Sequence, residues 1–204
     1  MKKVDDRNSD YWRIVSELEA QVPPTFLRSS MNEELDGGEH LLESMDHVVI
    51  CGDLNYRVDL PREISEKTVD EMTSTQDEKK ACGLRTSLLR HDQLLQTISE
   101  GRAFVDFSEG EIKFPPTFKF DKGTPDFDTS HKQRIPAWTD RVLFKHNKGV
   151  KVQEYNSVQN AMHSDHRPVF AKLSLNIEGR EVQAPEKPQK RRKRRKRKAA
   201  IGQE

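Results

Sequence analysis

Cysteine is scarce in this sequence, and long apolar runs are missing from it. Cys51 and Cys82 are the two cysteines among 204 residues, and neither belongs to a Cys-x-x-Cys or a spaced Cys/His pattern. A disulfide framework and a zinc site are therefore excluded, and a reducing compartment is expected. No run of about 18 apolar residues is present, and the first residues, MKKVDDRNSD, lack the apolar core of a signal peptide. We therefore expect a soluble cytoplasmic protein without a transmembrane segment.

Apolar residues are few overall, and charge is distributed unevenly. Hydrophobic residues make up 33% of the chain and charged residues 34%, which is a low apolar share for a fully packed domain. The net charge of +1 conceals a tail, residues 186–204, whose ten basic and two acidic residues carry +8, so the other residues carry −7. We therefore divide the chain into a domain, residues 1–178, and a disordered basic tail, residues 179–204.

The tail contains nine consecutive basic residues, of which Lys190 is the first and Lys198 the last. Such a run is typical of a nuclear localisation signal, an RNA-binding segment or a segment that binds anionic lipid headgroups. A solubilising disordered end is the simpler alternative. The expected partners of the tail are therefore an anionic membrane surface or the nuclear import machinery, with a peripheral membrane or nuclear location as the consequence.

The most informative stretch is residues 48–57, VVICGDLNYR. Its apolar start predicts a strand buried on both faces, which Gly52 then interrupts. In an extended backbone Asp53 and Asn55 would point to one side. A carboxylate beside an amide, at the carboxyl end of a buried strand, lies where open α/β sheets bind ligands. Such a pair could take a proton from water and hold a phosphate oxygen. The alternative is a turn, which Asp and Asn residues often shape.

Periodicity predicts several further elements. Apolar residues at helical spacing indicate a helix capped by Ser9 and ended by Pro23, and a second helix that follows Pro61. A longer helix is expected from Leu84 to Ser99. Residues 141–144 and 150–152 read as a hairpin around the turn at residues 147–149, and residues 169–175 as a last alternating strand. The second helix is expected to bury Ile64, Val69 and Met72.

Two later stretches contain candidate acid/base groups. Residues 135–141 read IPAWTDR and residues 164–168 read SDHRP. A histidine next to a carboxylate at a strand end, here His166 beside Asp165, is a candidate acid/base or phosphate-binding group. Asp140 could hold the His166 imidazole in one tautomer. Taken singly, each has a simpler interpretation: a surface Asp-His pair, a core Trp138 and a solvated Arg141.

Taken in order, the motifs GDLNYR, PAWTDR and SDHRPV resemble those of the inositol polyphosphate 5-phosphatases, in the endonuclease/exonuclease/phosphatase superfamily. Residues 88–94, LLRHDQL, and 114–120, FPPTFKF, are also similar. Agreement of several motifs in order is far more specific than one pattern. The resemblance implies an α/β fold that is part of a four-layer α/β/β/α sandwich (DNase I-like). It also implies Mg²⁺-dependent hydrolysis of the 5-phosphate of phosphoinositides or inositol polyphosphates.

The resemblance assigns roles to individual residues. Asp53 would activate the attacking water and Asn55 would hold water and phosphate in line. His166, oriented by Asp140, would bind the scissile phosphate, and Asp165 would lie close to the metal. The family usually has a tyrosine at the position of Phe118, whose hydroxyl can bind the neighbouring 4-phosphate. The remaining substrate-binding residues implied by the motifs are Tyr56, Arg57, Lys119, Lys132, Arg134 and Arg141.

In that family the matched region begins midway through the catalytic domain. The resemblance therefore implies that this chain is the carboxyl-terminal half, apparently lacking the amino-terminal half with its sheet, a metal-binding glutamate and a further histidine. This leaves open whether the fragment is active. Two alternatives remain: a nuclease of the same superfamily, and a non-catalytic remnant that binds anionic lipid or nucleic acid through its basic tail.

Overall fold

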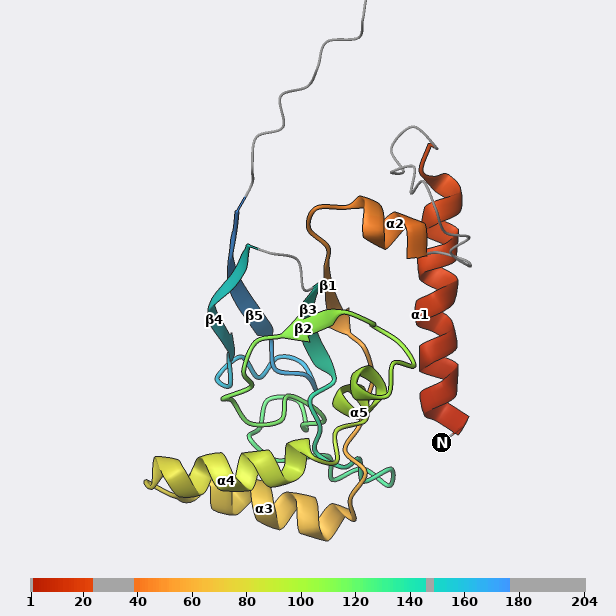
Figure 1. Cartoon of the computed structure of the whole chain (residues 1–204). Coiled ribbons are helices and arrows are strands. Elements are labelled where there is room, and N and C mark those ends of the chain that lie inside the picture. Colours follow the sequence, from red (N-terminus) through yellow and green to blue (C-terminus); the bar gives the residue numbers. More distant parts are fainter. Residues whose placement is uncertain (1, 24–38, 146–148, 177–204) are drawn as a thin grey trace, which may run out of the picture.

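The computed structural model describes residues 2–23, 39–145 and 149–176, and Figure 1 shows their arrangement. Helix α1 runs alongside β1 (Figure 1). Helices α3 and α4 lie side by side below the two sheets in the view of Figure 1. None of the helices in these ranges combines the length and apolar composition that a membrane span needs. The elements in order are α1 (Lys2–Gln21), α2 (Glu39–Ser44), β1 (Val49–Asp53), α3 (Arg62–Ser74), α4 (Glu78–Leu89), α5 (Gln93–Ser99), β2 (Phe107–Glu109), β3 (Asp140–Lys145), β4 (Val150–Ser157) and β5 (Val169–Leu175).

The strands form two antiparallel sheets. One has the order β1-β3-β2 and the other consists of β4 and β5. The expected hairpin between residues 141–144 and 150–152 is therefore wrong, because β3 and β4 belong to different sheets; its turn, residues 147–149, lies largely outside the described residues. The strand at residues 169–175 is confirmed as β5. Strand β1 is also not buried on both faces: Val49 is 43% exposed, because the described residues leave its side of the strand partly uncovered.

The helices differ from the predicted ones in where they begin and in what they bury. Asp92 accepts a hydrogen bond from the Leu95 N–H and starts α5, so the expected single helix from Leu84 to Ser99 is in fact two. Helix α1 already begins at Lys2, so Ser9 lies inside it and is not its cap. Helix α3 follows Pro61 as expected, but Ile64 is 52% exposed whereas Val69 and Met72 are buried.

Two apolar clusters pack on opposite faces of β3. Leu143 belongs to the cluster under α1, together with Tyr11 and Phe104. Val142 packs against the cluster built around Trp138. Successive strand residues point to opposite faces, so β3 separates the two clusters. This central position makes β3 the strand on which the candidate site depends.

Arg141 is fully buried on β3 and is enclosed by two carboxylates. Its Nη1 donates to both carboxylate oxygens of Asp92 at 3.0 Å, and its Nε donates to Glu109 Oε1 at 2.7 Å. The Tyr155 hydroxyl donates to the same Glu109 oxygen at 2.5 Å. Burial alone would lower the pKa of Arg141, but Asp92 and Glu109 raise it. The expected role of Arg141 in substrate binding is therefore wrong, because a side chain with no exposed surface cannot contact a substrate.

Replacing the buried guanidinium should strongly destabilise the chain. We expect Arg141→Met to lower the free energy of unfolding by about 3–5 kcal/mol, because two buried carboxylates lose their counter-charge. Arg13→Met is the matched control: Arg13 is 61% exposed and pairs with Asp10 and Glu17 on α1. Loss of those surface pairs should leave the free energy of unfolding nearly unchanged, because exposed ion pairs contribute little to stability. Urea denaturation measures both, and equal effects would contradict this account of Arg141.

Candidate active site

The site lies where β1 and β3 meet at one end of the three-stranded sheet. The antiparallel register places Asp53, the last residue of β1, directly opposite Asp140, the first residue of β3. Two like charges at opposite positions repel each other, which destabilises a strand pair unless something compensates. The Asp140 carboxylate is compensated by hydrogen-bond donors, whereas Asp53 is exposed to solvent. The two carboxylates therefore have different environments.

A tight turn follows Asp53. The Asn55 backbone N–H donates to Asp53 Oδ1 at 2.9 Å, and Asn55 has a φ of 59°, which asparagine tolerates better than most residues. The predicted turn is therefore present. Arg57 donates through Nη2 to the Asn55 side-chain oxygen and through Nε to its carbonyl oxygen at 3.2 Å. With that oxygen occupied, the Asn55 side chain offers its NH₂ group, a donor suited to a phosphate oxygen.

Asp140 and His166 are paired, as the sequence predicted. His166 Nδ1 lies 2.9 Å from Asp140 Oδ2. Because an ionised carboxylate can only accept, Nδ1 carries the proton, which leaves Nε2 as the ring nitrogen that Asp140 does not use. The same Asp140 oxygen accepts from the Thr139 hydroxyl at 2.9 Å and the Thr117 hydroxyl at 3.2 Å. These two threonines were not predicted, because no sequence pattern shows to which carboxylate a distant hydroxyl donates.

The pairing shifts the pKa of each partner. The hydrogen bond to Asp140 raises the pKa of His166, and nearby carboxylates add to that effect. Burial alone would raise the pKa of Asp140, but the hydrogen bonds from His166 and Thr139 lower it. The charged pair is therefore favoured over the pH range between the two groups' ordinary pKa values of 3.8 and 6.5, and somewhat beyond both.

Phe118 separates two cationic groups of the site. The Arg57 guanidinium lies 4.2 Å from the centre of the Phe118 ring, and the His166 ring lies 4.6 Å away from it. Burial and the neighbouring Arg7 lower the pKa of Arg57 to about 10, which leaves it charged at neutral pH. Phe118 therefore packs between these groups and contributes no hydroxyl.

A loop with buried Asp128 presents further cations. The Asp128 carboxylate accepts from the backbone N–H groups of Ser130 at 3.1 Å and Arg134 at 2.9 Å, and it pairs with Lys119 Nζ at 3.4 Å. Burial would raise the pKa of Asp128, but these hydrogen bonds hold it well below its ordinary value. The side chains of Lys132 and Arg134 are exposed. The structure thus brings Lys119, Lys132 and Arg134 to one loop cluster.

Two predicted residues have structural roles that the sequence did not distinguish. Tyr56 is buried, and its hydroxyl donates to Asn8 Oδ1 at 2.6 Å, which ties α1 to the segment after β1. Its expected contact with substrate is therefore wrong, and burial raises its pKa to about 12. Asp165 is half-buried, and its carbonyl oxygen accepts from the Phe120 N–H at 2.9 Å.

Arg167 was missed by the sequence analysis. Its guanidinium lies 3.8 Å from the centre of the Phe120 ring and donates to the carbonyl oxygens of Ser164 and Thr124 at 3.3 and 2.5 Å. The side chain is almost completely buried. Arg167 thereby fixes the segment that carries His166 against the loop that follows Phe120. The only signal in the sequence was its place beside His166.

The donors for a metal are of the right kind but few. Within the described ranges, no group of three or more His, Cys, Asp or Glu side chains is close enough to hold an ion. Asp53 and Asp165 offer carboxylate oxygens, which magnesium prefers, whereas the Asn55 side-chain oxygen is held by Arg57. Mg²⁺ often binds one or two carboxylates with water and substrate phosphate completing its shell. These residues therefore fit a magnesium ion that is shared with a substrate, and not one held by them alone.

Removing the Asp140 charge should change the titration of His166. We expect Asp140→Asn to lower the pKa of His166, because the hydrogen bond to the carboxylate is the largest cause that raises it. A group with a raised pKa stabilises the fold fully below its unfolded value, about 6.5, and loses that contribution as pH rises through its folded value. The stability gap between wild type and variant should therefore shrink as pH rises above neutrality.

The imidazole proton signals of His166, followed by NMR against pH, measure this shift. Asp70→Asn, which removes an exposed carboxylate on α3, is the matched control and should leave the His166 titration in place. An unchanged or higher His166 pKa in Asp140→Asn would show that the pairing does not control the imidazole.

The chain is similar to known proteins over most of its length. Residues 1–172 match Endonuclease/Exonuclease/phosphatase family 2. The type IV inositol polyphosphate 5-phosphatase 11 of Arabidopsis thaliana is 36% identical over 178 residues, which cover 85% of this chain and 45% of that protein. Synaptojanin-2 of Homo sapiens is 36% identical over 212 residues, which cover 91% of this chain and 12% of that protein. The chain thus spans less than half the length of these curated relatives.

Two solved structures share the fold. The inositol polyphosphate 5-phosphatase domain of SPsynaptojanin, in complex with inositol (1,4)-bisphosphate and calcium, matches with a TM-score of 0.60 and 32% identity, over 85% of this chain and 43% of that one. A ferrous NO complex of Cimex nitrophorin matches with a TM-score of 0.55 and 30% identity, over 66% of this chain and 44% of that one. These likenesses confirm the expected DNase I-like α/β fold, as part of that domain. The chain therefore belongs to the endonuclease/exonuclease/phosphatase family 2, in which its relatives are inositol polyphosphate 5-phosphatases.

Proposed function

We propose that this chain carries the water-activating and phosphate-binding residues of an enzyme that removes the 5-phosphate from phosphoinositides or inositol polyphosphates. The observation that carries the proposal is the meeting of three separate segments: the Asp53–Asn55 turn lies across the strand pair from Asp140, which holds His166. Relatives named as 5-phosphatases match this part of the chain, and one solved relative is a complex with inositol (1,4)-bisphosphate.

The Asp53–Asn55 turn would handle the attacking water. One Asp53 oxygen is held by the Asn55 backbone N–H, so the other can accept the proton of a water molecule as its oxygen attacks phosphorus. The Asn55 NH₂ group would donate to a phosphoryl oxygen and thereby keep water and phosphate in line. Both side chains are exposed at the end of β1, which gives a substrate access to them.

His166 would stabilise the phosphoryl group during the reaction. Its Nδ1–H is used by Asp140, so Nε2 is the atom that can donate to a phosphoryl oxygen. The raised pKa favours the protonated ring that this role needs. Phosphoryl transfer relies mainly on positioning and on stabilising charge at the phosphoryl oxygens, and His166 with Arg57 would supply both as the bond to the inositol oxygen breaks.

Magnesium is part of this proposal. Asp53 and Asp165 are the residues that would share it with the substrate, since their carboxylates supply oxygen donors, while the Asn55 side-chain oxygen is held by Arg57. When bound, Mg²⁺ would add positive charge next to the phosphoryl oxygens. The solved synaptojanin domain contains calcium, a cation with the same preference for oxygen ligands. Lys119, Lys132 and Arg134 would bind a neighbouring phosphate of the inositol ring.

Phosphate release tests the proposal directly. We expect the chain with Mg²⁺ to release inorganic phosphate from inositol 1,4,5-trisphosphate or from vesicles that contain phosphatidylinositol 4,5-bisphosphate. Asp53→Asn should lower the rate at least about 100-fold, because a positioned general base contributes that much or more. Asp70→Asn on α3 is the matched control and should keep the wild-type rate. Equal rates for wild type and Asp53→Asn would overturn the assignment of Asp53.

A second candidate function is binding of anionic ligands without hydrolysis. The small number of metal donors among the described residues favours it. It predicts that inositol 1,4,5-trisphosphate binds, that Asp53→Asn leaves this binding intact, and that no phosphate is released with or without Mg²⁺. The basic run that begins at Lys190 lies outside the described residues, and its role in recruitment to anionic membranes or in nuclear import stays a prediction, as do the cytoplasmic location and the extent of the tail.

A further inference from the structure

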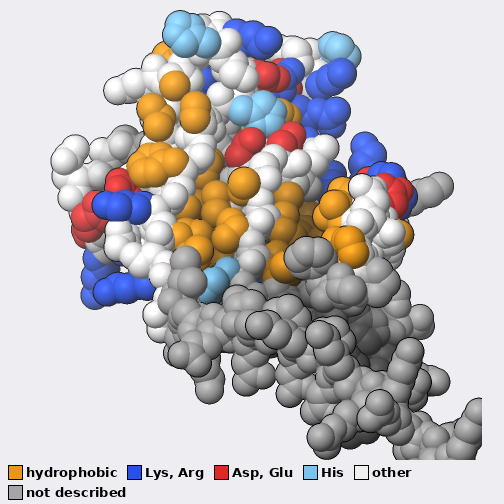
Figure 2. Space-filling model, turned by 90° about the horizontal axis from the view of Figure 1, so that it is seen from above, with side chains coloured by type: hydrophobic (Ala, Val, Ile, Leu, Met, Phe, Trp, Pro, Cys, Tyr) orange, Lys and Arg blue, Asp and Glu red, His pale blue; other side chains and the backbone are white. Residues whose placement is uncertain are grey.

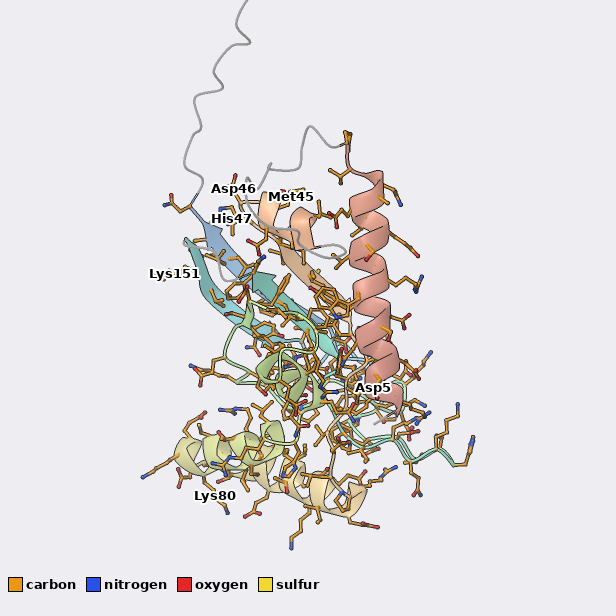
Figure 3. All side chains as sticks on the ribbon, turned by 45° about the vertical axis from the view of Figure 1, so that its right-hand side comes forward. Asp5, Met45, Asp46, His47, Lys80 and Lys151 are labelled. Carbon is orange, nitrogen blue, oxygen red and sulfur yellow. The ribbon has the colours of Figure 1, made fainter. Side chains whose placement is uncertain are left out.

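Gln93, the first residue of α5, buries a polar side chain that no earlier argument has used. Figure 2 shows apolar side chains across the middle of one face and most of the charged side chains around them, whereas Gln93 is polar and only 9% exposed. In Figure 1, α5 lies beside the lower end of α1, the end that Asp5 marks in Figure 3. The Gln93 amide bonds to this end of α1 and to the segment that follows β1.

Three hydrogen bonds fix the Gln93 side chain. Its Oε1 accepts from Arg7 Nη1 and from the Arg57 backbone N–H, each at 3.0 Å, and its Nε2 donates to Asp59 Oδ1 at 2.7 Å. One orientation of the amide satisfies these partners, because two of them are donors and the third is a carboxylate. A rotated amide would place its NH₂ group against both donors and its oxygen against the carboxylate.

Gln93 also holds the main chain of Arg57 on both sides of the residue. Its backbone N–H donates to the Arg57 carbonyl oxygen at 2.9 Å, while its side chain accepts from the Arg57 N–H. Between these bonds, Val58 pairs with Asp92 in an antiparallel bridge. Asp92 caps α5 and binds the buried Arg141. The helix end that carries Gln93 is therefore fixed, and it can hold Arg57 in place.

From Arg57 the contacts continue into the candidate active site. The Arg57 side chain donates through Nη2 to the Asn55 side-chain oxygen and through Nε to the Asn55 carbonyl oxygen at 3.2 Å. Its guanidinium also lies 4.2 Å from the centre of the Phe118 ring. Because the main chain of Arg57 is clamped by Gln93, the side chain that orients the Asn55 amide starts from a fixed point.

We propose that Gln93 is a positioning residue of the candidate active site. By holding Arg57, it keeps the Asn55 NH₂ group in the direction in which a phosphoryl oxygen would be bound. Gln93 acts through Arg57 and touches no reacting atom. Misplacement of such a group by about 1 Å can lower a rate about 100-fold. The effect on the rate rests on the proposed function, whereas the control of Arg57 and Asn55 does not.

NMR of the full chain tests the positioning without a substrate. The probes are the Arg57 Nε–H and the Asn55 side-chain NH₂ signals, neither of which comes from a group bonded to Gln93. We expect Gln93→Leu to shift both signals and to speed exchange of the Arg57 Nε–H with water at least about tenfold, because local opening becomes easier. Gln96→Leu is the matched control on the same helix: the Gln96 amide donates to the Arg90 carbonyl oxygen, and its loss should leave both signals in place.

A compensating pair of substitutions separates hydrogen bonding from packing. Gln93→Glu keeps an acceptor for the Arg57 N–H but places a carboxylate against Asp59, so we expect both signals to shift. Adding Asp59→Asn supplies an NH₂ group that can donate to the introduced carboxylate. The double variant Gln93→Glu/Asp59→Asn should therefore return both signals to their wild-type positions, whereas Gln93→Leu/Asp59→Asn should not.

Phosphate release from inositol 1,4,5-trisphosphate with Mg²⁺ gives the kinetic readout. We expect Gln93→Leu to lower kcat at least about tenfold while KM changes less than about threefold, because an interaction that aligns the transition state is lost and ground-state binding is kept. Gln96→Leu should keep the wild-type kcat, and Gln93→Glu/Asp59→Asn should recover most of it.

The outcomes that would overturn the proposal are distinct. Circular dichroism shows whether each variant is folded. A folded Gln93→Leu chain with wild-type Arg57 and Asn55 signals would overturn it, and so would shifted signals with an unchanged kcat. If Gln93→Leu unfolds the chain, the comparison of Gln93→Glu with its Asp59→Asn double variant decides, and a failure to recover the signals would contradict the proposal. A wild-type chain that releases no phosphate would overturn the proposed function, and the NMR signals would still decide whether Gln93 controls Arg57 and Asn55.

Discussion

A buried guanidinium holds the elements of this structure in register. Arg141 lies on β3, the middle strand of the three-stranded sheet. Its side chain binds Asp92, which also caps α5, and Glu109 at the end of β2. Through Glu109 it is joined to Tyr155 on β4. A buried charge is destabilising unless its partners are in place, so β3, α5, β2 and β4 have to pack in a way that brings these partners to the guanidinium. Loss of any one partner would leave a buried charge without compensation.

The packing of Arg141 also affects the candidate active site, because Asp140 is the adjacent residue on β3. Asp140 precedes Arg141 on β3 and projects from the opposite face of the strand. Whatever fixes Arg141 therefore also fixes the carboxylate that holds His166. Asp53 lies opposite Asp140 on β1 but has a single backbone donor, whereas Asp140 has three side-chain donors. Two facing carboxylates thus have different environments: one holds an imidazole, and the other is exposed, as the general base of the proposed reaction would need to be.

The sequence predicted the local chemistry better than the long-range packing. The turn at Asp53 and Asn55 could be expected, because a short motif encodes it. The pairing of Asp140 with His166, which are 26 residues apart, could be expected because each lies in a recognisable motif with a candidate acid/base group. The role of Arg141 could not, since its partners lie 49 and 32 residues away and only the folded chain brings them together. The hairpin failed for a related reason: β3 and β4 are neighbours in sequence, but each finds a better strand partner elsewhere.

The burial of β1 was overestimated from its apolar sequence for a physical reason. Its apolar run is typical of a strand covered on both faces, and the described chain covers it only in part. The run of residues 48–51 therefore predicts more cover than the described residues supply. Sequence and structure differ here because a pattern reports the environment a segment requires, whereas the structure shows the environment that this chain supplies.

A crystal structure of the chain with inositol (1,4)-bisphosphate and calcium, the ligands of the solved synaptojanin domain, would test the central claim most directly. The account predicts a phosphate group within hydrogen-bond distance of His166 Nε2 and the Asn55 side chain, with Asp140 still bound to His166 Nδ1. A phosphate bound elsewhere, or a His166 ring turned away from Asp140 when the ligand is present, would contradict it.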